Sequence, residues 1–587
     1  MLRRLLQSAT RDRARRLNAR GITEWQRGDL AVAERTLRAA LKKGGQPGTA
    51  ANLGMVLAAQ GRPDEALVLL RQAVERDPDH AGARINLAAL LHQGGGIPEA
   101  VRHLREALRI EPGNTTARAN LLKPLMDLCD WPAVEAEVRR LNEEAGRAVG
   151  EAEQAGSWPD AWADAILPFE SLLLPLSPRL QLRVARRHAA RYAAAVNPLP
   201  RAAVNPARVD AGGRLRIGYL SADFHDHATA HLAGGLFATH DRTRVEVVAY
   251  SIDAPLAVSY GQGEAYRRRI VQGCDRFVDA SASSSRDLAR RIAADGIHVL
   301  LDMKGYTGGS RPEVLAMRPA PLQVSFLGYP GTMGAGFIDY LIADRTVIAP
   351  GSEDCYSEAL AFMPGSYQVN DRQAVAEAPG RAACGLPERG FVFCCFNQLY
   401  KIDAAVFAAW MRILAAVHGS VLWLLAGQAA AEERLREAAA AARVDPARLV
   451  FAPYADKAAH LARYAHADLF LDTLAVNAHT TASDALWAGV PVLTCPGRTF
   501  ASRVGASLLT ALDMADGIAS SLHDYERSAI ALAGGGPQLA ELRARLAANR
   551  ATHSLFDTAA YARALEGAFA RMWGEYRQGR RPASFQA

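Results

Sequence analysis

The chain lacks the features of several protein classes. No run of about 18–20 apolar residues occurs among its 587 residues, so no membrane-spanning helix is expected. The first residues contain no long apolar stretch, so no secretory signal is expected either. Half of the residues are hydrophobic and 22% are charged, which is ordinary for a globular protein and excludes wholesale disorder. At roughly 100–200 residues per domain, the length predicts several structural units.

Cysteine is scarce and follows no pattern. The seven cysteines are scattered, odd in number and without a CxxC pair. Neither a zinc ribbon nor a disulfide framework is expected, and this usage is typical of a reduced, cytoplasmic protein. No GxGxxG, P-loop or GxSxG motif occurs, so the common short signatures of nucleotide and hydrolase sites are also missing.

Excess positive charge is confined to one end of the chain. Residues 1–20 hold seven arginines and one aspartate, which is +6 of the formal net charge of +7. The remainder is nearly neutral, so nucleic-acid binding by the body of the protein is not expected. The basic arm at 1–20 is interpreted either as a solvated helix face or as a segment that touches a membrane surface or RNA.

The stretch 21–148 contains an internal repeat. Small residues let paired helices pack closely, and a proline ends the second helix of each pair. The recurring positions are Gly54, Ala66, Ala73 and Pro78, matched one period later by Ala88, Ala100, Ala107 and Pro112. The period and the pattern are those of tetratricopeptide repeats and predict a short solenoid with a concave face.

An asparagine recurs with the same period. Asn52, Asn86 and Asn120 lie one repeat apart from each other, and Asn18 continues the series. Each amide offers donors and an acceptor that match the backbone of an extended peptide. The alternative is that the amides satisfy neighbouring turns within the solenoid. A peptide-binding surface is therefore one of two interpretations.

Two sets of alternating strands and helices follow a helical connector expected over 149–210. Near-continuous apolar strands separated by helices predict parallel sheets that are covered on both faces. The first set, 211–370, and the second, 371–587, predict two doubly wound, Rossmann-like lobes facing one cleft. An apolar stripe over 559–577 predicts a docking helix, which is counted with the second lobe.

Polar groups follow the strands of the second lobe, where ligands of such sheets bind. His479, Thr480 and Thr481 lie where one loop enters a helix. Backbone N–H groups at that helix start could hold a diphosphate, with a plain capped helix as the alternative. Asp484, one turn further, either accepts from ribose hydroxyls or only favours the helix dipole.

Two further loops of that lobe add basic groups. Lys401 follows an apolar strand and could neutralise a leaving diphosphate, with an isolated surface lysine as the alternative. Lys457 and His460 follow another strand and suit a ribose or a base. Three consecutive loops of this kind predict a nucleotide pocket.

Three histidines follow the first strand of the first lobe: His225, His227 and His231. HxxxH spacing on a helix could bind a metal, but no glutamate occupies the metalloprotease position. A proton-transfer or hydrogen-bonding role is therefore favoured, and no metal site is predicted.

These segments carry a resemblance to a known family. GYLSADFHDHATAHL, CCFNQLYKID and HTTASDALWAGVPVLT, with further segments between 210 and 577, resemble the O-linked N-acetylglucosamine (O-GlcNAc) transferases. Members of that family are glycosyltransferases with a two-lobed GT-B fold behind a tetratricopeptide solenoid. The animal members insert a domain between the lobes, for which the stretch 365–388 is too short here.

The resemblance implies a reaction as well as a fold. It implies transfer of N-acetylglucosamine from UDP-GlcNAc to Ser/Thr hydroxyls of protein acceptors, with inversion and without a metal. It implies roles by position. Lys401 and the start of the helix at His479, Thr480 and Thr481 would lie at the diphosphate, Gln398 and Ala455 at the uridine, Lys457 and Asp484 at the ribose, and His460 near the uracil. His227 would face the sugar and acceptor, and His298 would lie near the same cleft. His227 is a proposed general base in the family, and a substrate phosphate oxygen is its rival.

Two alternatives stay open. The same fold could use another nucleotide sugar, such as GDP-fucose or UDP-glucose, or the chain could be a peptide-binding scaffold with an inactive transferase half. The presence of Lys401, His227 and the 479–481 segment counts against the scaffold. The expected partners are a UDP-sugar and peptide acceptors along the solenoid; an oligomer is possible, and no nucleic acid is expected.

Overall fold

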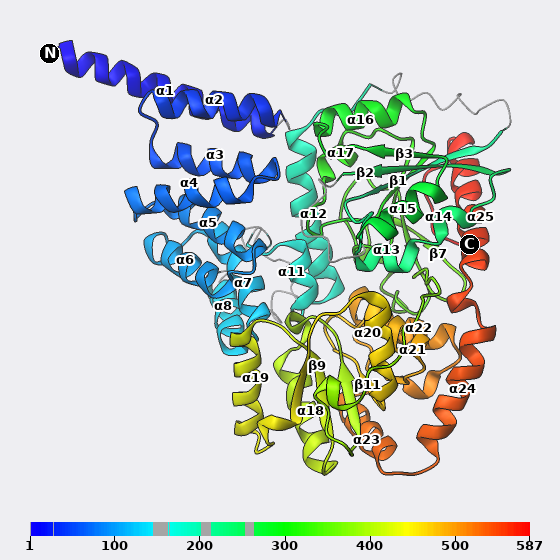
Figure 1. The fold of residues 1–587 in the computed structure, drawn as a ribbon. Coiled ribbons are helices and arrows are strands. Elements are labelled where there is room, and N and C mark those ends of the chain that lie inside the picture. The colour runs from blue at the N-terminus through cyan, green and yellow to red at the C-terminus, as the bar shows by residue number, and fades with distance from the viewer. Residues whose placement is uncertain (1, 27–28, 145–162, 164, 201–212, 253–262) are drawn as a thin grey trace.

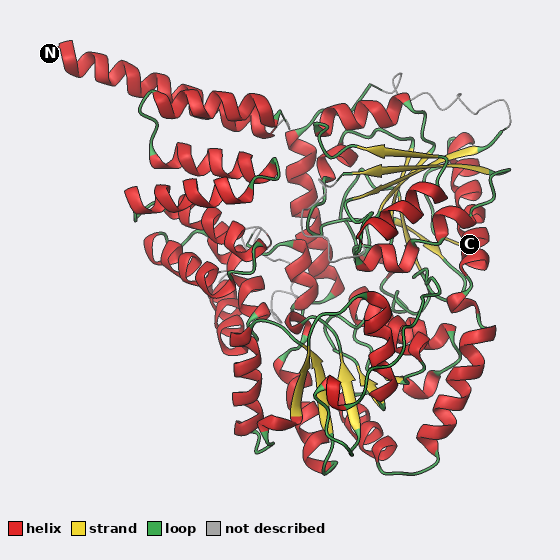
Figure 2. Ribbon diagram, in the orientation of Figure 1, coloured by secondary structure: helices red, strands yellow, loops and turns green. Residues whose placement is uncertain are grey.

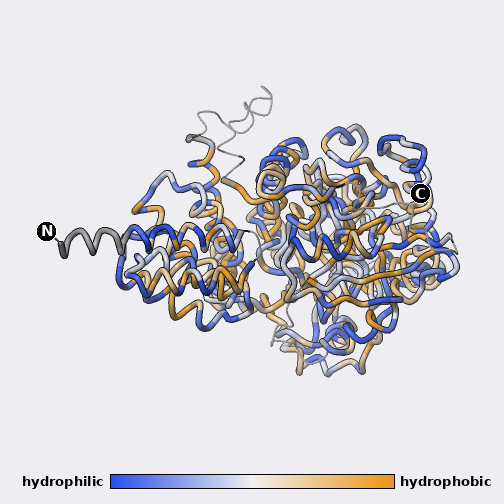
Figure 3. The backbone as a smooth tube through the Cα atoms, turned by 90° about the horizontal axis from the view of Figure 1, so that it is seen from above, coloured by the Kyte–Doolittle hydropathy of each residue, from blue (hydrophilic) through white to orange (hydrophobic). Residues whose placement is uncertain are grey.

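The structure is a computed structural model that describes residues 2–26, 29–144, 163, 165–200, 213–252 and 263–587 (Figure 1). The predicted connector, 149–210, falls partly outside these residues. A purely helical part stands beside a body that contains two sheets (Figure 2). The views from the front and from above agree on this side-by-side arrangement (Figures 1 and 3). Within the described ranges, no helix is both long and apolar enough to cross a membrane.

The helical part consists of paired helices, as the repeat predicts. In chain order they are α1 (Leu2–Gln26), α2 (Leu30–Lys42), α3 (Pro47–Ala59), α4 (Pro63–Arg76), α5 (Ala81–Gln93), α6 (Ile97–Ile110), α7 (Thr115–Asp127) and α8 (Trp131–Glu144). From α3 onward, equivalent helices begin exactly one sequence period apart. A Cβ at Gly54 would lie 2.9 Å from Cγ of Leu70, so glycine permits the close approach of α3 and α4. The tetratricopeptide prediction is confirmed.

In the described part of the connector, two helices stand between the solenoid and the body. They are α11 (Pro168–Leu173) and α12 (Pro178–Ala195), which stand between the two parts in Figure 1. Leu122 and Met126 of α7 belong to the same buried apolar cluster as Leu172 of α11 and Tyr329 of the first lobe. The last repeat is therefore packed onto the body through a continuous core rather than tethered to it.

The first lobe is built on an eight-stranded parallel sheet in the order β13-β7-β6-β5-β4-β1-β2-β3. Its strands are β1 (Leu215–Ser221), β2 (Val245–Ser251), β3 (Arg276–Asp279), β4 (Val299–Asp302), β5 (Leu322–Ser325), β6 (Tyr340–Ala343), β7 (Ala359–Phe362) and β13 (Phe585–Gln586). Its helices are α13 (Ala228–Ala233), α14 (Leu236–Thr239), α15 (Gly263–Gly273), α16 (Ser285–Ala294) and α17 (Pro312–Ala316). Five of the eight strands, namely β1, β2, β4, β5 and β6, lie within the apolar runs LRIGYLS, VEVVAYS, IHVLLDM, LQVSFLG and YLIAD.

The second lobe has a five-stranded parallel sheet in the order β10-β9-β8-β11-β12. The strands are β8 (Val392–Cys395), β9 (Val421–Leu425), β10 (Leu449–Ala452), β11 (Leu469–Leu471) and β12 (Val492–Leu493). The helices are α18 (Ala404–Ala416), α19 (Ala429–Ala441), α20 (Lys457–Arg463), α21 (Thr480–Ala488), α22 (Val504–Ala511), α23 (Leu522–Ala533) and α24 (Gln538–Thr552). β8 and β11 are buried at every position, as expected of central parallel strands. The prediction of two doubly wound lobes is confirmed.

The end of the chain returns to the first lobe, which corrects the predicted boundary. Helix α25 (Thr558–Arg577) packs against α14 and β5, and β13 extends the first sheet beside β7 (Figure 1). Glu566 of α25 anchors the helix: its Oε1 accepts from the backbone N–H of Asp241 at 3.0 Å and lies 2.9 Å from Nδ1 of His240. Counting 559–577 with the second lobe was wrong, because an apolar stripe does not specify which lobe covers it.

Candidate functional site

Hydrogen bonds join the loops that follow β8 and β11 of the second lobe. Lys401 ends the 3-10 turn η4 (Leu399–Lys401) after β8, and its Nζ donates to the carbonyl of Asn477 at 3.0 Å. Thr481, at the start of α21, donates through Oγ1 to Oδ1 of Asn397. The predicted diphosphate residues are thus brought together at the carboxyl ends of neighbouring strands.

Lys401 is a partly buried cation with an acidic neighbour. Burial lowers its pKa to about 8, against the attraction of Asp472. Asp472 follows β11 and is fully buried; its oxygens accept from the backbone N–H of Ala478 at 2.6 Å and from Oγ1 of Thr494 at 2.7 Å. Burial raises the pKa of Asp472 to about 7. Asp472 was not among the predicted site residues, although it directly follows an apolar strand.

The start of α21 leaves room for an anion. His479 occupies the N-cap position, and its side chain makes no capping hydrogen bond. Burial, with Lys401 nearby, lowers the pKa of His479 to about 3, so its ring is neutral at pH 7. Thr480 is partly exposed at the first helical position. Backbone N–H groups of a first turn that no cap side chain occupies can bind an anion, which favours the diphosphate interpretation over a plain capped helix.

A buried ion pair links α20 to α21. Nζ of Lys457 donates to Oδ1 of Asp484 at 2.5 Å, and Nε2 of His460 lies 3.8 Å from Oδ2 of the same carboxylate. Asp456 caps α20 by accepting from the backbone N–H of Ala459 at 2.9 Å, which fixes Lys457 at the first position of the helix. These three predicted residues therefore form one cluster.

His460 is an uncharged ring in an aromatic setting. Its ring lies edge-on to Phe396 at 5.2 Å and to Tyr464 at 5.3 Å between centroids. Burial lowers its pKa well below the ordinary value of a histidine. Gln398, at the cap of η4, is exposed, and Ala455, between β10 and α20, is partly exposed. Both lie in the same strand-end loops as the charged groups.

His227 caps α13 in the first lobe. Its Nδ1 accepts from the backbone N–H of Thr229 at 3.1 Å and lies 3.4 Å from Oδ2 of Asp223. Burial lowers the pKa of His227 to about 4, so the ring is neutral at pH 7. Because Nδ1 accepts a hydrogen bond, the proton of the neutral ring is on Nε2. His227 therefore presents a donor, not a base.

A second buried ion pair supports that histidine. Nζ of Lys304 donates to Oδ1 of Asp223 at 2.7 Å, and Oγ1 of Thr229 donates to Oδ2 at 3.0 Å. Asp302, at the end of β4, accepts from the backbone N–H groups of Lys304 at 3.0 Å and Gly305 at 3.1 Å. Lys304 was not among the predicted site residues, because the sequence does not show whether a lysine is buried or exposed.

The two lobes meet at α13 and α21. Gln373 joins them: its Nε2 donates to the carbonyl of His231 at 2.6 Å, and its own carbonyl accepts from Nε1 of Trp487 at 2.9 Å. Nε2 of His231 lies 2.6 Å from Oδ1 of Asp226, so this histidine is tied to its own loop. Among the described residues, no three His, Cys, Asp or Glu side chains form a group that could hold a metal ion.

His298 is not part of this arrangement. Its backbone N–H donates to the carbonyl of Arg216 at 3.0 Å, and its Nδ1 accepts from the backbone N–H of Arg216 at 2.8 Å. Arg216 lies at the start of β1, and His298 immediately precedes β4. Its ring packs against Trp573 of α25 at 4.6 Å between centroids. His298 therefore lies at the amino ends of the strands, opposite to the loops that hold His227 and Lys304. The expected position of His298 near the cleft was wrong.

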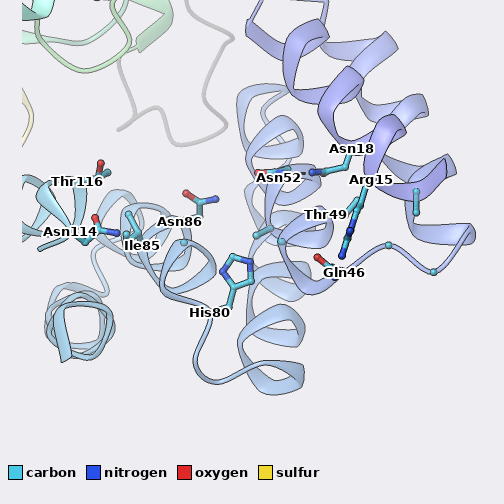
Figure 4. A pocket seen from close by; sticks show the side chains of 16 residues that line it. Arg15, Asn18, Gln46, Thr49, Asn52, His80, Ile85, Asn86, Asn114 and Thr116 are labelled. Carbon is cyan, nitrogen blue, oxygen red and sulfur yellow. Dashed lines mark hydrogen bonds between the residues drawn. The ribbon is translucent and has the colours of Figure 1, made fainter. Parts of the chain in front are cut away.

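The asparagine series divides between the two interpretations. Asn18, Asn52 and Asn86 line one groove of about 840 Å³ on the solenoid (Figure 4). Nδ2 of Asn52 donates to Oδ1 of Asn18 at 3.1 Å, so these two amides also satisfy each other. Asn120 does not line the groove, and its Nδ2 donates to the carbonyl of Thr116 in its own helix at 2.8 Å. Asn120 thus fits the internal interpretation.

Comparisons with known proteins agree with this architecture. The model of glycosyl transferase family 41 matches residues 128–379 and 375–565, and tetratricopeptide-repeat models match 18–67 and 47–111. The chain is similar to a probable UDP-N-acetylglucosamine–peptide N-acetylglucosaminyltransferase of Arabidopsis thaliana, with 40% identity over 436 residues that cover 72% of this chain and 44% of that protein.

Two further relatives extend the comparison. The UDP-N-acetylglucosamine–peptide N-acetylglucosaminyltransferase of Caenorhabditis elegans is 30% identical over 571 residues, covering 77% of this chain and 48% of that protein. The chain thus spans about half the length of these curated relatives. A solved structure, a variant of the O-GlcNAc transferase of Thermobaculum terrenum, superposes with a TM-score of 0.69 at 27% identity, covering 98% of this chain and 99% of that one.

Proposed function

The chain belongs to glycosyl transferase family 41, and from this premise we propose that it transfers N-acetylglucosamine from UDP-GlcNAc to Ser and Thr hydroxyls of protein acceptors. The observation that carries the proposal is the cluster at the strand ends of the second lobe. There Lys401 and the start of α21 supply positive charge, and the Lys457–Asp484 pair lies beside them. The relatives named above supply the identity of the sugar.

The proposed reaction is a single displacement with inversion. An acceptor hydroxyl attacks C1 of the sugar, the C1–O bond to the diphosphate breaks, and the electron pair leaves with UDP. Lys401 and the first-turn N–H groups of α21 then face the growing negative charge, and fixed donors of this kind are each worth roughly 2–4 kcal/mol of barrier. An anion beside Lys401 raises its pKa above the value of about 8 in the free protein, so the lysine is protonated when the donor is bound.

No metal is needed for this scheme, because the protein's own positive groups face the diphosphate. Asp484 and Lys457 are proposed to meet the ribose, and the neutral ring of His460, with Gln398 and Ala455, the uridine. Binding would exchange part of the 2.5 Å Lys457–Asp484 contact for hydrogen bonds to ribose hydroxyls. Such an exchange keeps both buried charges hydrogen-bonded.

The proton of the acceptor hydroxyl is proposed to leave without help from His227. A base needs a nitrogen lone pair. The lone pair of the neutral His227 ring is on Nδ1, and it already accepts a hydrogen bond from the backbone N–H of Thr229. Its Nε2–H instead donates to the sugar or the acceptor. The rival acceptor of the proton, a phosphate oxygen of the donor itself, is therefore favoured.

Acceptor peptides are proposed to lie in the solenoid groove that holds Asn52 and Asn86. Amides at this spacing can bond the backbone of an extended chain without selecting side chains. All seven cysteines carry free thiols, which suits the proposed reducing, cytoplasmic location.

A donor screen tests the proposal. The full chain is incubated with UDP-GlcNAc, UDP-glucose or GDP-fucose and a peptide library, and products are identified by mass spectrometry. We expect UDP release and a mass gain of one N-acetylhexosamine on Ser or Thr. Turnover of GDP-fucose alone would assign another sugar. Peptide binding without turnover of any donor would assign a scaffold.

A further inference from the structure

The turn that presents Lys401 is held from the solenoid side. Trp131, the first residue of α8, donates through Nε1 to the carbonyl of Ile402 at 2.8 Å. Sγ of Cys129 lies 3.7 Å from the carbonyl of Leu399. These two carbonyls flank Lys401 on either side, so the last repeat bonds the backbone on both sides of the proposed catalytic lysine.

A lysine of the solenoid also reaches the residue next to Lys401. Nζ of Lys123, on α7, lies 3.8 Å from the centroid of the Tyr400 ring. Nζ of Lys123 also donates to Oδ1 of Asp127 on the same helix. The other oxygen of that carboxylate, Oδ2, lies 2.6 Å from Nε2 of His92. A cation over an aromatic face is attractive, more so when water is excluded.

The surroundings of this contact are buried and charged. Phe169 of the connector lies edge-on to Tyr400 at 6.1 Å between centroids. Its neighbour Glu170 is 8% exposed, and burial raises the pKa of that carboxyl to about 7. Lys123 therefore faces Asp127 from the solenoid, Glu170 from the connector and Tyr400 from the second lobe, while His92 holds the other oxygen of Asp127. Such a cluster restricts where Tyr400 can move.

We propose that Lys123 is a positioning residue for the donor site: its contact with Tyr400 fixes the turn that aims Lys401 at the diphosphate. The last solenoid repeat then helps to position the donor site, in addition to any contact that the solenoid makes with acceptors. The inference rests on the proposed function, because it takes Lys401 to act on a nucleotide diphosphate. Displacement of a catalytic group by about 1 Å can cost as much as 100-fold in rate, so a loosened turn has a measurable effect.

The test compares two substitutions of one residue in the full chain. Lys123→Met keeps the length of the side chain and removes the charge, whereas Lys123→Arg keeps a cation that can stack on the ring and pair with Asp127. Lys42→Met, at the exposed end of α2, is the control. Readouts are UDP affinity by calorimetry, kcat, the KM of the acceptor peptide and the thermal unfolding midpoint.

We expect Lys123→Met to weaken UDP binding and lower kcat by about 10-fold, a change in the range of a desolvated cation–π contact. The acceptor KM should stay unchanged, and Lys123→Arg should restore most of both losses. Unchanged UDP affinity and kcat in the Met variant would overturn the proposal. A loss confined to acceptor KM, or a loss that arginine does not rescue, would also overturn it.

A second pair of variants tests the proposal if Lys123→Met does not fold. Tyr400→Phe keeps the ring under Lys123, and Tyr400→Leu removes it, so only the leucine variant should lose UDP affinity. Equal affinity in the two would contradict the positioning role. UDP titration needs no sugar transfer. A wild-type chain that binds UDP but transfers no N-acetylglucosamine would refute the proposed function, while these comparisons would still decide the role of Lys123.

Discussion

Replacing Lys401 with methionine should strongly slow transfer and stabilise the nucleotide-free protein. The lysine is held in a site that penalises its charge, since burial outweighs the attraction of Asp472 and lowers the pKa from 10.5 to about 8. That decrease corresponds to an unfavourable free energy of about 3 kcal/mol for the charged side chain in the folded protein. Methionine fills a similar volume without that charge, so about 3 kcal/mol is the upper limit of the gain.

The pH dependence of this gain has a defined sign. Below pH 8 the lysine is charged in the folded and unfolded chains alike, so the full penalty is present in the wild type. As the pH rises from about 8 towards 10.5, the folded protein loses the proton first and the penalty fades. The advantage of the Lys401→Met variant should therefore be largest at neutral pH and vanish near pH 10.5.

The assay pairs unfolding with turnover. Urea unfolding of the nucleotide-free chain is followed at pH 7 and pH 10, and kcat is measured at pH 7. We expect kcat to fall by about 100- to 1,000-fold, the usual cost of removing one charge-stabilising donor. A variant that is less stable at pH 7 and retains near-normal kcat would refute both the burial argument and the role of Lys401. Lys42→Met, with its exposed side chain, should change neither quantity.

Three further predictions concern residues at other places. Asp484→Asn leaves Lys457 charged and unpaired in a buried site. The free energy of unfolding, measured in urea, should therefore fall by about 3 kcal/mol, and UDP affinity should weaken. Wild-type values of both quantities in the variant would contradict the pairing. His298→Asn should lower the unfolding midpoint and leave kcat unchanged, whereas a tenfold loss of kcat would return His298 to the site. Asn86→Ala should raise the acceptor KM without affecting hydrolysis of the donor, and a change in stability alone would assign the amide to the solenoid's own turns.

Much of the fold could be predicted because burial leaves a local pattern. β8 and β11 were visible as apolar runs, since central parallel strands are covered on both faces. The repeat was visible because each helix pair must present small residues to its neighbour at the same offsets. The position of Lys401 and His479 after strand ends also followed from local order along the chain.

The candidate site was predictable only in part, because the sequence shows which residues are charged but not which of them are buried. Asp472 and Lys304 are almost fully buried. The apolar strands before them mark their place at strand ends, but not that their side chains are buried or which charge they pair with. His298 could have been corrected from the sequence alone. It stands before its strand rather than after it, and in a parallel sheet this is the end away from the ligand.

The sequence by itself determined the order of units, the two parallel sheets and the loops that hold the charged groups, because hydrophobic periodicity and strand order are local properties. Only the tertiary structure decided that α25 and β13 close the first lobe and that Lys123 meets Tyr400. Those contacts join surfaces that lie far apart along the chain. Their pairing depends on shape and charge complementarity between whole elements, which exists only once both elements have folded.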